Sequence, residues 1–215
     1  MLDEALLERR RRQNLSAPRQ DARGVAPSIR NFAQAIDRQR QSLERVPLLR
    51  ASRADLVEAA LALDEAEVAA LAISIDDPQA ELRRFAEAAR QVSVPVLRVD
   101  LLLEEFQVYE SRAAGADALL LHPRALTAEM LARMAQAASS THMVPCIVCE
   151  NGDDLARAAS LRAPVIALAS FELKAPPRTL VLALSPPPKG SADAVLDESI
   201  QDAAAFRAAL AAGVI

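Results

Sequence analysis

The sequence predicts an α/β protein of the TIM-type (β/α)8 barrel class, in which eight parallel strands alternate with helices. Two observations carry this prediction. Eight apolar runs of five to eight residues recur from residue 46 onward, as expected for strands that are buried on both faces. Between most of these runs, apolar residues recur at every third or fourth position, which is the spacing of an amphipathic helix. Eight strands in this alternation favour a closed barrel over an open sheet.

The order of the elements divides the chain into two parts. Residues 1–45 are polar and are expected to form an N-terminal helical extension in two pieces, because two prolines and a glycine interrupt the pattern within 16–28. Residues 46–215 are expected to form the barrel. Its predicted strands are 46–50, 68–75, 95–102, 118–122, 144–150, 164–170, 179–185 and 193–199, and its predicted helices are 55–65, 79–91, 104–114, 127–139, 153–161 and 202–212.

Composition narrows the function class. Of 215 residues, 52% are hydrophobic and 25% are charged, and the formal net charge is −4, so nucleic acid is not an expected partner. No apolar stretch reaches the roughly 18 residues that a membrane-spanning helix needs, and the N-terminus lacks a secretion signal. We therefore expect a cytoplasmic protein without a membrane partner, and we expect no cofactor.

The two cysteines, Cys146 and Cys149, have the spacing of a redox or metal motif but lie within an apolar run. In a strand, residues three apart point to opposite faces, so the two thiols are not expected to form a disulfide or to bind one ion. The sequence predicts no metal site.

Two connections are too short for the expected alternation. Only 171–178 joins the sixth strand to the seventh, and only 186–192 joins the seventh to the eighth, whereas a parallel crossover normally takes a dozen or more residues. The helices after strands six and seven should thus be missing or reduced to loops. Five or six large side chains would then face water, at a cost on the order of 10 kcal/mol. We expect the N-terminal extension, or a homodimer or heteromeric complex, to cover strands six and seven.

Residues 92–126, VSVPVLRVDLLLEEFQVYESRAAGADALLLHPRAL, resemble the third strand, the following helix and the fourth strand of indole-3-glycerol phosphate synthase. That family's pattern reads PVLRKDF, then a helix, then Ala-Arg-x-x-Gly-Ala-Asp before an apolar strand. Weaker matches are the RNFAQAI of 30–36, the Arg-Ala-Ser of 50–52 and the SADAVLDESI of 191–200. The resemblance covers nearly the whole chain, with deletions in the last third, and it implies a barrel fold.

The family closes an anthranilate-derived, phosphorylated substrate to an indole with loss of carbon dioxide and water, which is a carboxy-lyase reaction of tryptophan biosynthesis. The resemblance implies a set of lysines, glutamates and an asparagine that perform this chemistry. Motif matching places these positions on residues that differ from the family: Pro47, Leu49, Val99, Cys149 and Ala169. Proline, leucine, valine and alanine side chains cannot transfer a proton. The sequence therefore contains no intact catalytic set.

Four residues remain as candidates for ligand binding: Ser52, His122, Cys149 and Ser185. Strand alternation is expected to place His122 and Cys149 on one face of the barrel mouth, the end at which the strands' carboxyl ends meet. The family holds its phosphate near the loops after strands seven and eight. In this chain, prolines without an N–H occupy 186–188, and Asp197 and Glu198 add negative charge.

Three hypotheses about function follow. The first is a non-catalytic binding or regulatory protein, that is, a pseudoenzyme of this family. The second is an enzyme of altered chemistry that uses His122, Cys149, Asp76 and Glu150 in the barrel mouth. The third is residual synthase activity. The sequence identifies neither the small-molecule ligand nor the protein partner. Asp100, which the family also has, is expected to have a structural role.

Overall fold

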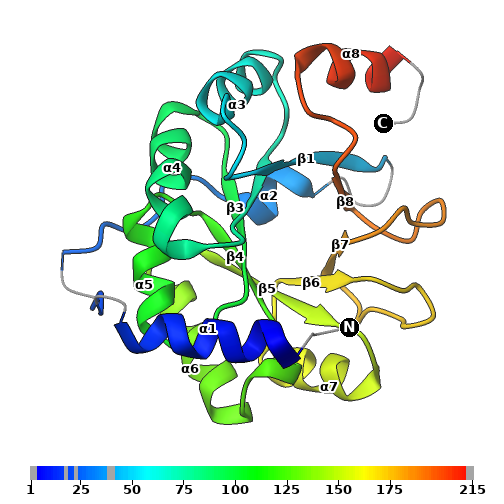
Figure 1. The fold of residues 1–215 in the computed structure, drawn as a ribbon. Coiled ribbons are helices and arrows are strands. Elements are labelled where there is room, and N and C mark those ends of the chain that lie inside the picture. Colours follow the sequence, from blue (N-terminus) through cyan, green and yellow to red (C-terminus); the bar gives the residue numbers. More distant parts are fainter. Residues whose placement is uncertain (1–3, 17–18, 22–23, 38–41, 212–215) are drawn as a thin grey trace.

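The computed structural model describes residues 4–16, 19–21, 24–37 and 42–211. Within them, eight parallel strands close into a barrel in which each strand pairs with its neighbours in the chain and β8 pairs with β1 (Figure 1). The closed barrel confirms the predicted fold class, and each predicted strand contains or overlaps an observed one. The strands are β1 Glu44–Arg50, β2 Leu71–Ser74, β3 Val96–Val99, β4 Ala118–Leu121, β5 Val144–Cys149, β6 Val165–Leu168, β7 Leu180–Ala183 and β8 Ala194–Asp197.

The helices follow the predicted pattern closely, and several begin at a polar residue that caps the first turn. Asp77, Thr127 and Asn151 each accept a hydrogen bond from a backbone N–H at the start of the helix that follows. The helices are α1 Glu4–Ser16, α2 Phe32–Ile36, α3 Leu56–Glu65, α4 Pro78–Gln91, α5 Phe106–Ala113, α6 Ala128–Ser140, α7 Gly152–Ser160 and α8 Ala203–Ala211, with a short 3-10 helix at Pro123–Ala125. Among the described helices, none combines the length and the hydropathy needed to span a bilayer.

Alternation along the strands sorts the apolar side chains into two cores. Leu48 pairs with Ala72 across β1 and β2, and both belong to the inner core of the barrel. The next pair, Leu49 and Ile73, belongs to the outer core between the barrel and its helices. The register therefore decides which side chains can reach the barrel mouth and which are covered by helices.

Helix α2 of the N-terminal extension closes the end of the barrel at which the strands begin. Phe32 and Ile36 of α2 are completely buried and pack with the inner core, which includes the first inward residues of several strands, among them Val46 and Val144. Helix α1 lies elsewhere in the same extension and contacts α5, where Asn14 bonds to Gln107 (Figure 1). The two helical pieces of the extension thus have separate positions in the fold.

The structure corrects the expectation that strands six and seven expose apolar side chains. Helices are absent between β6, β7 and β8 as expected, yet the outward side chains of β6 and β7 have at most 1% of their surface exposed; these residues are Ile166, Leu168, Val181 and Ala183. Phe171, Leu173 and Ala175 from the connection between β6 and β7 pack against the same outer core. The chain buries these strands itself, so the energetic reason for a dimer or complex is removed, and such an assembly stays a prediction.

A buried carboxylate joins the extension to the barrel. Asp117, which is fully buried at the start of β4, accepts hydrogen bonds from Ser28 Oγ at 2.5 Å and from the Val96 backbone N–H at 2.9 Å. The same side chain forms ion pairs with Arg30 and Arg112, each at 2.8 Å. All its acceptor positions are used, as burial of a charge requires.

We predict that Asp117→Ala lowers the free energy of unfolding by about 3–5 kcal/mol, because it leaves two partly buried guanidinium groups without their counter-charge. Urea unfolding followed by circular dichroism measures this change. The matched control is Glu87→Ala, which removes only an exposed pair with Arg83 and should cost less than about 1 kcal/mol. Equal losses in the two variants would contradict the structural role of Asp117.

Candidate functional site

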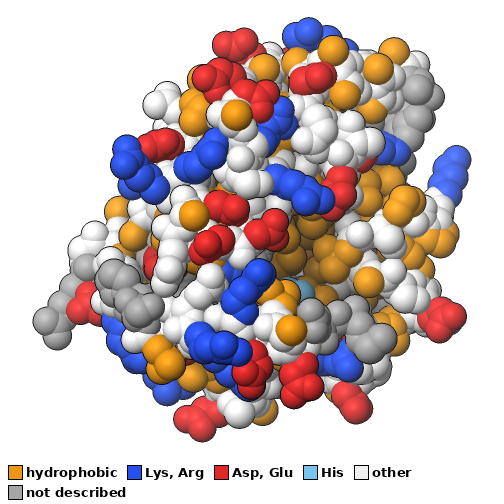
Figure 2. All heavy atoms as spheres, viewed as in Figure 1, with side chains coloured by type: hydrophobic (Ala, Val, Ile, Leu, Met, Phe, Trp, Pro, Cys, Tyr) orange, Lys and Arg blue, Asp and Glu red, His pale blue; other side chains and the backbone are white. Residues whose placement is uncertain are grey.

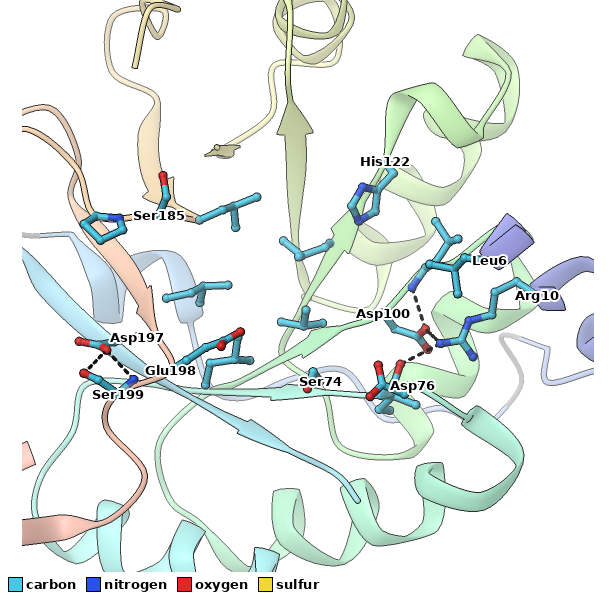
Figure 3. Close-up of a pocket in the computed structure, with 18 residues that line it drawn as sticks. Leu6, Arg10, Ser74, Asp76, Asp100, His122, Ser185, Asp197, Glu198 and Ser199 are labelled. Atoms are coloured by element: carbon cyan, nitrogen blue, oxygen red, sulfur yellow. Dashed lines mark hydrogen bonds and ion pairs between the residues drawn. The ribbon is translucent and has the colours of Figure 1, made fainter. Parts of the chain in front are cut away.

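A pocket of about 740 Å³ opens at the barrel mouth. In the space-filling view it is a hollow with an orange apolar interior (Figure 2), and Figure 3 shows its lining in detail, with His122 labelled. Parallel barrels place their ligands at this end, where loops can vary without disturbing the core. The lining residues are Leu6, Arg10, Leu48, Ser74, Ile75, Asp76, Val99, Asp100, Leu101, Leu120, His122, Leu184, Ser185, Pro186, Leu196, Asp197, Glu198 and Ser199.

The floor of the pocket is aliphatic. Four strands contribute one inward side chain each, the residue directly after β7 contributes a fifth, and all five pack with the inner core of the barrel. None of the five can donate a proton, accept one or bind a metal ion. The five residues are Leu48, Val99, Leu120, Leu184 and Leu196.

Helix α1 forms one wall of the pocket, and a buried ion pair holds it there. Arg10 is only 2% exposed, and its Nη2 lies 2.7 Å from Asp100 and donates to the Ile75 carbonyl at 2.8 Å. Asp100 is also bound by Arg98 at 2.7 Å, and Arg98 in turn pairs with Glu110. Figure 3 shows Arg10 and Leu6 of α1 at the edge of the pocket. The expected structural role of Asp100 agrees with these contacts.

Burial of Arg10 removes its guanidinium from water, which is unfavourable for the charged form. Loss of solvation lowers the pKa of its guanidinium, although the attraction of Asp100 works against this change. Its Nε has no hydrogen-bond partner among the described residues. Arg10 therefore attaches the helix to the barrel through Nη2, while Nη1 donates to Gln13 within the same helix at 3.3 Å. Removal of Asp100 would leave the buried cation without its counter-charge.

Two amide side chains add a second attachment of α1. Asn14 and Gln107 donate to each other's carbonyl oxygens at 3.3 Å and 3.1 Å, and Gln107 also accepts from the backbone N–H groups of Leu103 and Glu104. Gln13 donates to Asp77 at 3.2 Å. The helix thus contacts the loops after β2 and β3, which border the mouth.

Of the eight residues given by the motif match or named as binding candidates, three line the pocket. Val99 lies on the floor, His122 lies at the end of β4, and Ser185 lies after β7, where its hydroxyl donates to the Ala169 carbonyl at 3.0 Å. Ser52 and Ala169 are exposed at loop positions outside the lining. The structure therefore brings together only part of the predicted set.

Strand register corrects the proposed pairing of Cys149 with His122. Cys149 is completely buried in the outer core, paired with Leu168, and its neighbour Val148 occupies the inner core instead. Cys146 lies in the inner core, so the expectation that the two thiols face opposite sides is confirmed. The expectation that Cys149 shares the mouth with His122 is wrong, because one residue along a strand reverses the facing.

The same alternation applies to β1. Leu49 packs in the outer core, and Pro47 has the same parity, whereas Val46 and Leu48 belong to the inner core. The two positions matched by motif on this strand are therefore not the side chains that face into the barrel. The inward residues are nevertheless aliphatic as well.

His122 is a neutral group in this setting. Burial lowers the pKa of its imidazole, and the more distant carboxylates of Glu150, Asp100 and Asp154 only partly oppose this effect. Glu150 pairs with Arg124 at 2.5 Å and is not part of the pocket lining. Of the residues considered for altered chemistry, only His122 and Asp76 line the pocket.

The loop after β8 satisfies its own polar groups. Asp197 accepts from the Ser199 backbone N–H at 2.9 Å and from the Ser199 hydroxyl at 2.6 Å, and it pairs with Arg45. These hydrogen bonds and the pairing with Arg45 lower the pKa of the Asp197 carboxyl despite its partial burial, which acts in the opposite direction. A carboxylate thus occupies the donors that an incoming phosphate would need.

Lysine is absent from the pocket. The sequence has two lysines, Lys174 and Lys189, and both are exposed in the connections around β7. Among the described residues, no group of three or more histidine, cysteine or acidic side chains could hold a metal ion. The arrangement offers apolar contact, carboxylates and one neutral imidazole.

Sequence reasoning missed the contribution of α1. Leu6, Arg10, Gln13 and Asn14 recur at helical spacing, yet three of the four are polar, so hydrophobic periodicity gives no signal for a docked face. The helix docks through charge and amide pairing, which hydropathy patterns do not detect.

We predict that Arg10→Ala accelerates amide hydrogen exchange in α1 by about 10–100-fold, because charge-assisted hydrogen bonds contribute roughly 1.5–3 kcal/mol. Hydrogen-exchange mass spectrometry measures this. The control is Arg11→Ala on the exposed side of the same helix, which should leave exchange near the wild-type rate. Unchanged exchange in Arg10→Ala would show that the ion pair does not hold the helix.

The lowered pKa of His122 predicts a loss of stability in acid. Between the folded pKa and the unfolded value of about 6.5, the unfolded chain binds more protons, so stability falls as pH drops through this window. Urea unfolding at pH about 7.5 and about 5.5 should show a smaller decrease for His122→Gln than for the wild type. His142→Gln, which alters an exposed histidine, should behave like the wild type, and equal decreases in all three would contradict the prediction.

Comparison with solved structures supports the fold. The chain is similar to 2-keto-3-deoxy-6-phospho-gluconate aldolase from Zymomonas mobilis, with a TM-score of 0.63 and 14% identity over 83% of this chain and 94% of that one. A 4-hydroxy-2-oxoglutarate aldolase from TTHB1 gives a TM-score of 0.61 at 19% identity, over 82% of this chain and 93% of that one. At such identity the likeness concerns the barrel alone.

Sequence comparison gives the family. The chain is 31% identical over 179 residues to an indole-3-glycerol phosphate synthase of Chlorobium phaeovibrioides, which covers 78% of this chain and 69% of that protein. It is 36% identical over 110 residues to the synthase of Neisseria meningitidis serogroup C, over 50% of this chain and 42% of that one. The match thus spans less than half of the Neisseria relative. The family model of indole-3-glycerol phosphate synthase matches residues 3–175, and the chain therefore belongs to this family.

Proposed function

We propose that this chain is a non-catalytic member of the indole-3-glycerol phosphate synthase family that binds a small molecule in its barrel mouth, in a role related to tryptophan biosynthesis. The observation that carries the proposal is the aliphatic floor. Leu48, Val99 and Leu184 stand among the side chains that face the pocket, and none can act as a general acid or base.

The distribution of lysine supports the same proposal. The family's chemistry uses lysine as a proton donor, and neither Lys174 nor Lys189 lines the pocket. His122 is the one imidazole in the described lining, and no cysteine or serine nucleophile is hydrogen-bonded to it among the described residues. These side chains in the pocket lining fit binding without turnover better than they fit an enzyme of altered chemistry.

The pocket itself supports the binding part of the proposal. Its volume of about 740 Å³ falls within the roughly 300–1,000 Å³ of small-molecule sites, and its apolar floor with a polar rim is typical of them. Space for a ligand is therefore preserved although the side chains for proton transfer are replaced.

We predict that the purified chain does not convert the synthase substrate to an indole above background. Each general acid or base contributes about 10²–10⁴ in rate, so loss of two should lower turnover by at least about 10⁴-fold. Indole absorbance measures product formation. The Chlorobium phaeovibrioides relative, assayed in parallel, serves as the control, and turnover by this chain at the relative's rate would refute the proposal.

A further inference from the structure

We propose that the ligand of the barrel mouth is an apolar molecule that carries a positively charged amine and no phosphate. This inference rests on the proposed function, since it assumes that the mouth binds a small molecule. It specifies the chemistry of that molecule from the charges that surround the apolar floor.

The floor selects an apolar body. The floor is made by Leu48, Val99, Leu120, Leu184 and Leu196. Figure 3 shows the labelled polar residues of the pocket around it, with His122 on one side and Glu198 on the other. Burial of apolar area gives roughly 25 cal/mol per Å², so a ring or short alkyl body would gain most of its affinity here.

The rim carries two carboxylates that can accept hydrogen bonds from a cationic ligand, although the charge of Asp76 also acts on Arg10. Asp76 and Glu198 are exposed, and neither side chain makes a hydrogen bond or ion pair with any residue in the described ranges. Both also line an adjoining recess with Arg50, so two carboxylates face one guanidinium there. Figure 3 shows Asp76 and Glu198 along the same side of the pocket. The excess charge of this rim is negative.

The remaining cations near the pocket are already neutralised. Arg10 is bound to Asp100, and Arg45 is bound to Asp197, so neither guanidinium is available to an anionic ligand. His122 is neutral at pH 7 because burial lowers its pKa. Among the described residues that line the pocket and its adjoining recess, an anion would therefore meet the carboxylates of Asp76 and Glu198 and, apart from the paired Arg10, only Arg50 as a positive partner.

Some of the backbone donors that a phosphate could use after β7 and β8 are absent or already bonded. The residues at 186–188 are prolines without N–H groups, and the Ser199 N–H is already bound by Asp197. The Ser185 hydroxyl donates to the Ala169 carbonyl. A phosphate group would have to displace these internal bonds, whereas an ammonium group needs only the acceptors that Asp76 and Glu198 provide.

The test uses three probes that share one apolar body and differ in charge: benzylamine, benzyl alcohol and benzyl phosphate. Affinities are measured by two-dimensional NMR titration of the full chain at low salt. We expect benzylamine to bind about fivefold more tightly than benzyl alcohol, since an exposed charge pair contributes up to about 1 kcal/mol, and benzyl phosphate to bind most weakly. The preference for the amine should decrease at high salt.

Variants separate the rim from the floor. The double variant Asp76→Asn with Glu198→Gln should bind the amine and the alcohol equally, while Glu172→Gln, at an exposed site outside the pocket, should keep the preference. Val99→Phe, which fills the floor, should weaken both probes, with circular dichroism showing that the variant is folded.

The outcomes distinguish the two proposals. If none of the probes binds, or if Val99→Phe leaves binding unchanged, the proposed binding function of the mouth is overturned. If the alcohol or the phosphate ester binds as tightly as the amine, or if the double variant keeps the preference, only the charge of the ligand has been inferred wrongly. The inference is supported if the wild type and Glu172→Gln prefer the amine and the double variant does not.

Discussion

The alternation of side chains along eight strands in a closed barrel is the constraint on which the site depends. Each strand gives one set of residues to the inner core and the next set to the outer core, and closure leaves no edge at which the register could shift. The composition of the mouth is therefore fixed by residues such as Leu48, Val99 and Leu184. Leu49 and Cys149 lie one position away on their strands and are covered by the outer layer instead.

A buried ion network gives this apolar mouth a defined wall. Asp100 accepts from Arg98 and Arg10, so one carboxylate connects β3, its covering helix α5 and the N-terminal helix α1. Such a network contributes orientation more surely than net stability, because desolvation of the charges offsets much of their attraction. In this barrel the network places Leu6 at the pocket. It also pairs Arg10 with Asp100, so the Arg10 guanidinium is not available to a ligand.

The short connections after β6 and β7 show how a barrel tolerates the loss of covering helices. Phe171 and Leu173 pack against the outer core that includes Ile166 and Val181, so apolar loop residues replace a helix over these strands. The expectation that these strands would expose several large side chains was wrong because it counted only helices as cover within the barrel. The connection between β6 and β7, residues 169–179, is too short for a crossover helix but long enough to bury a few side chains.

The sequence alone was enough to predict the barrel, the positions of its eight strands and of the six helices that follow β1, and the family, because these follow from local periodicity and motif spacing. Part of the site was also predictable, since Val99, His122 and Ser185 lie at ends of strands. Only the tertiary structure decided the facing of Cys149 and Leu49, the docking of α1 through Arg10 and the self-coverage of β6 and β7. These features depend on register and on contacts between residues far apart in the chain, which a one-residue shift reverses and hydropathy does not encode.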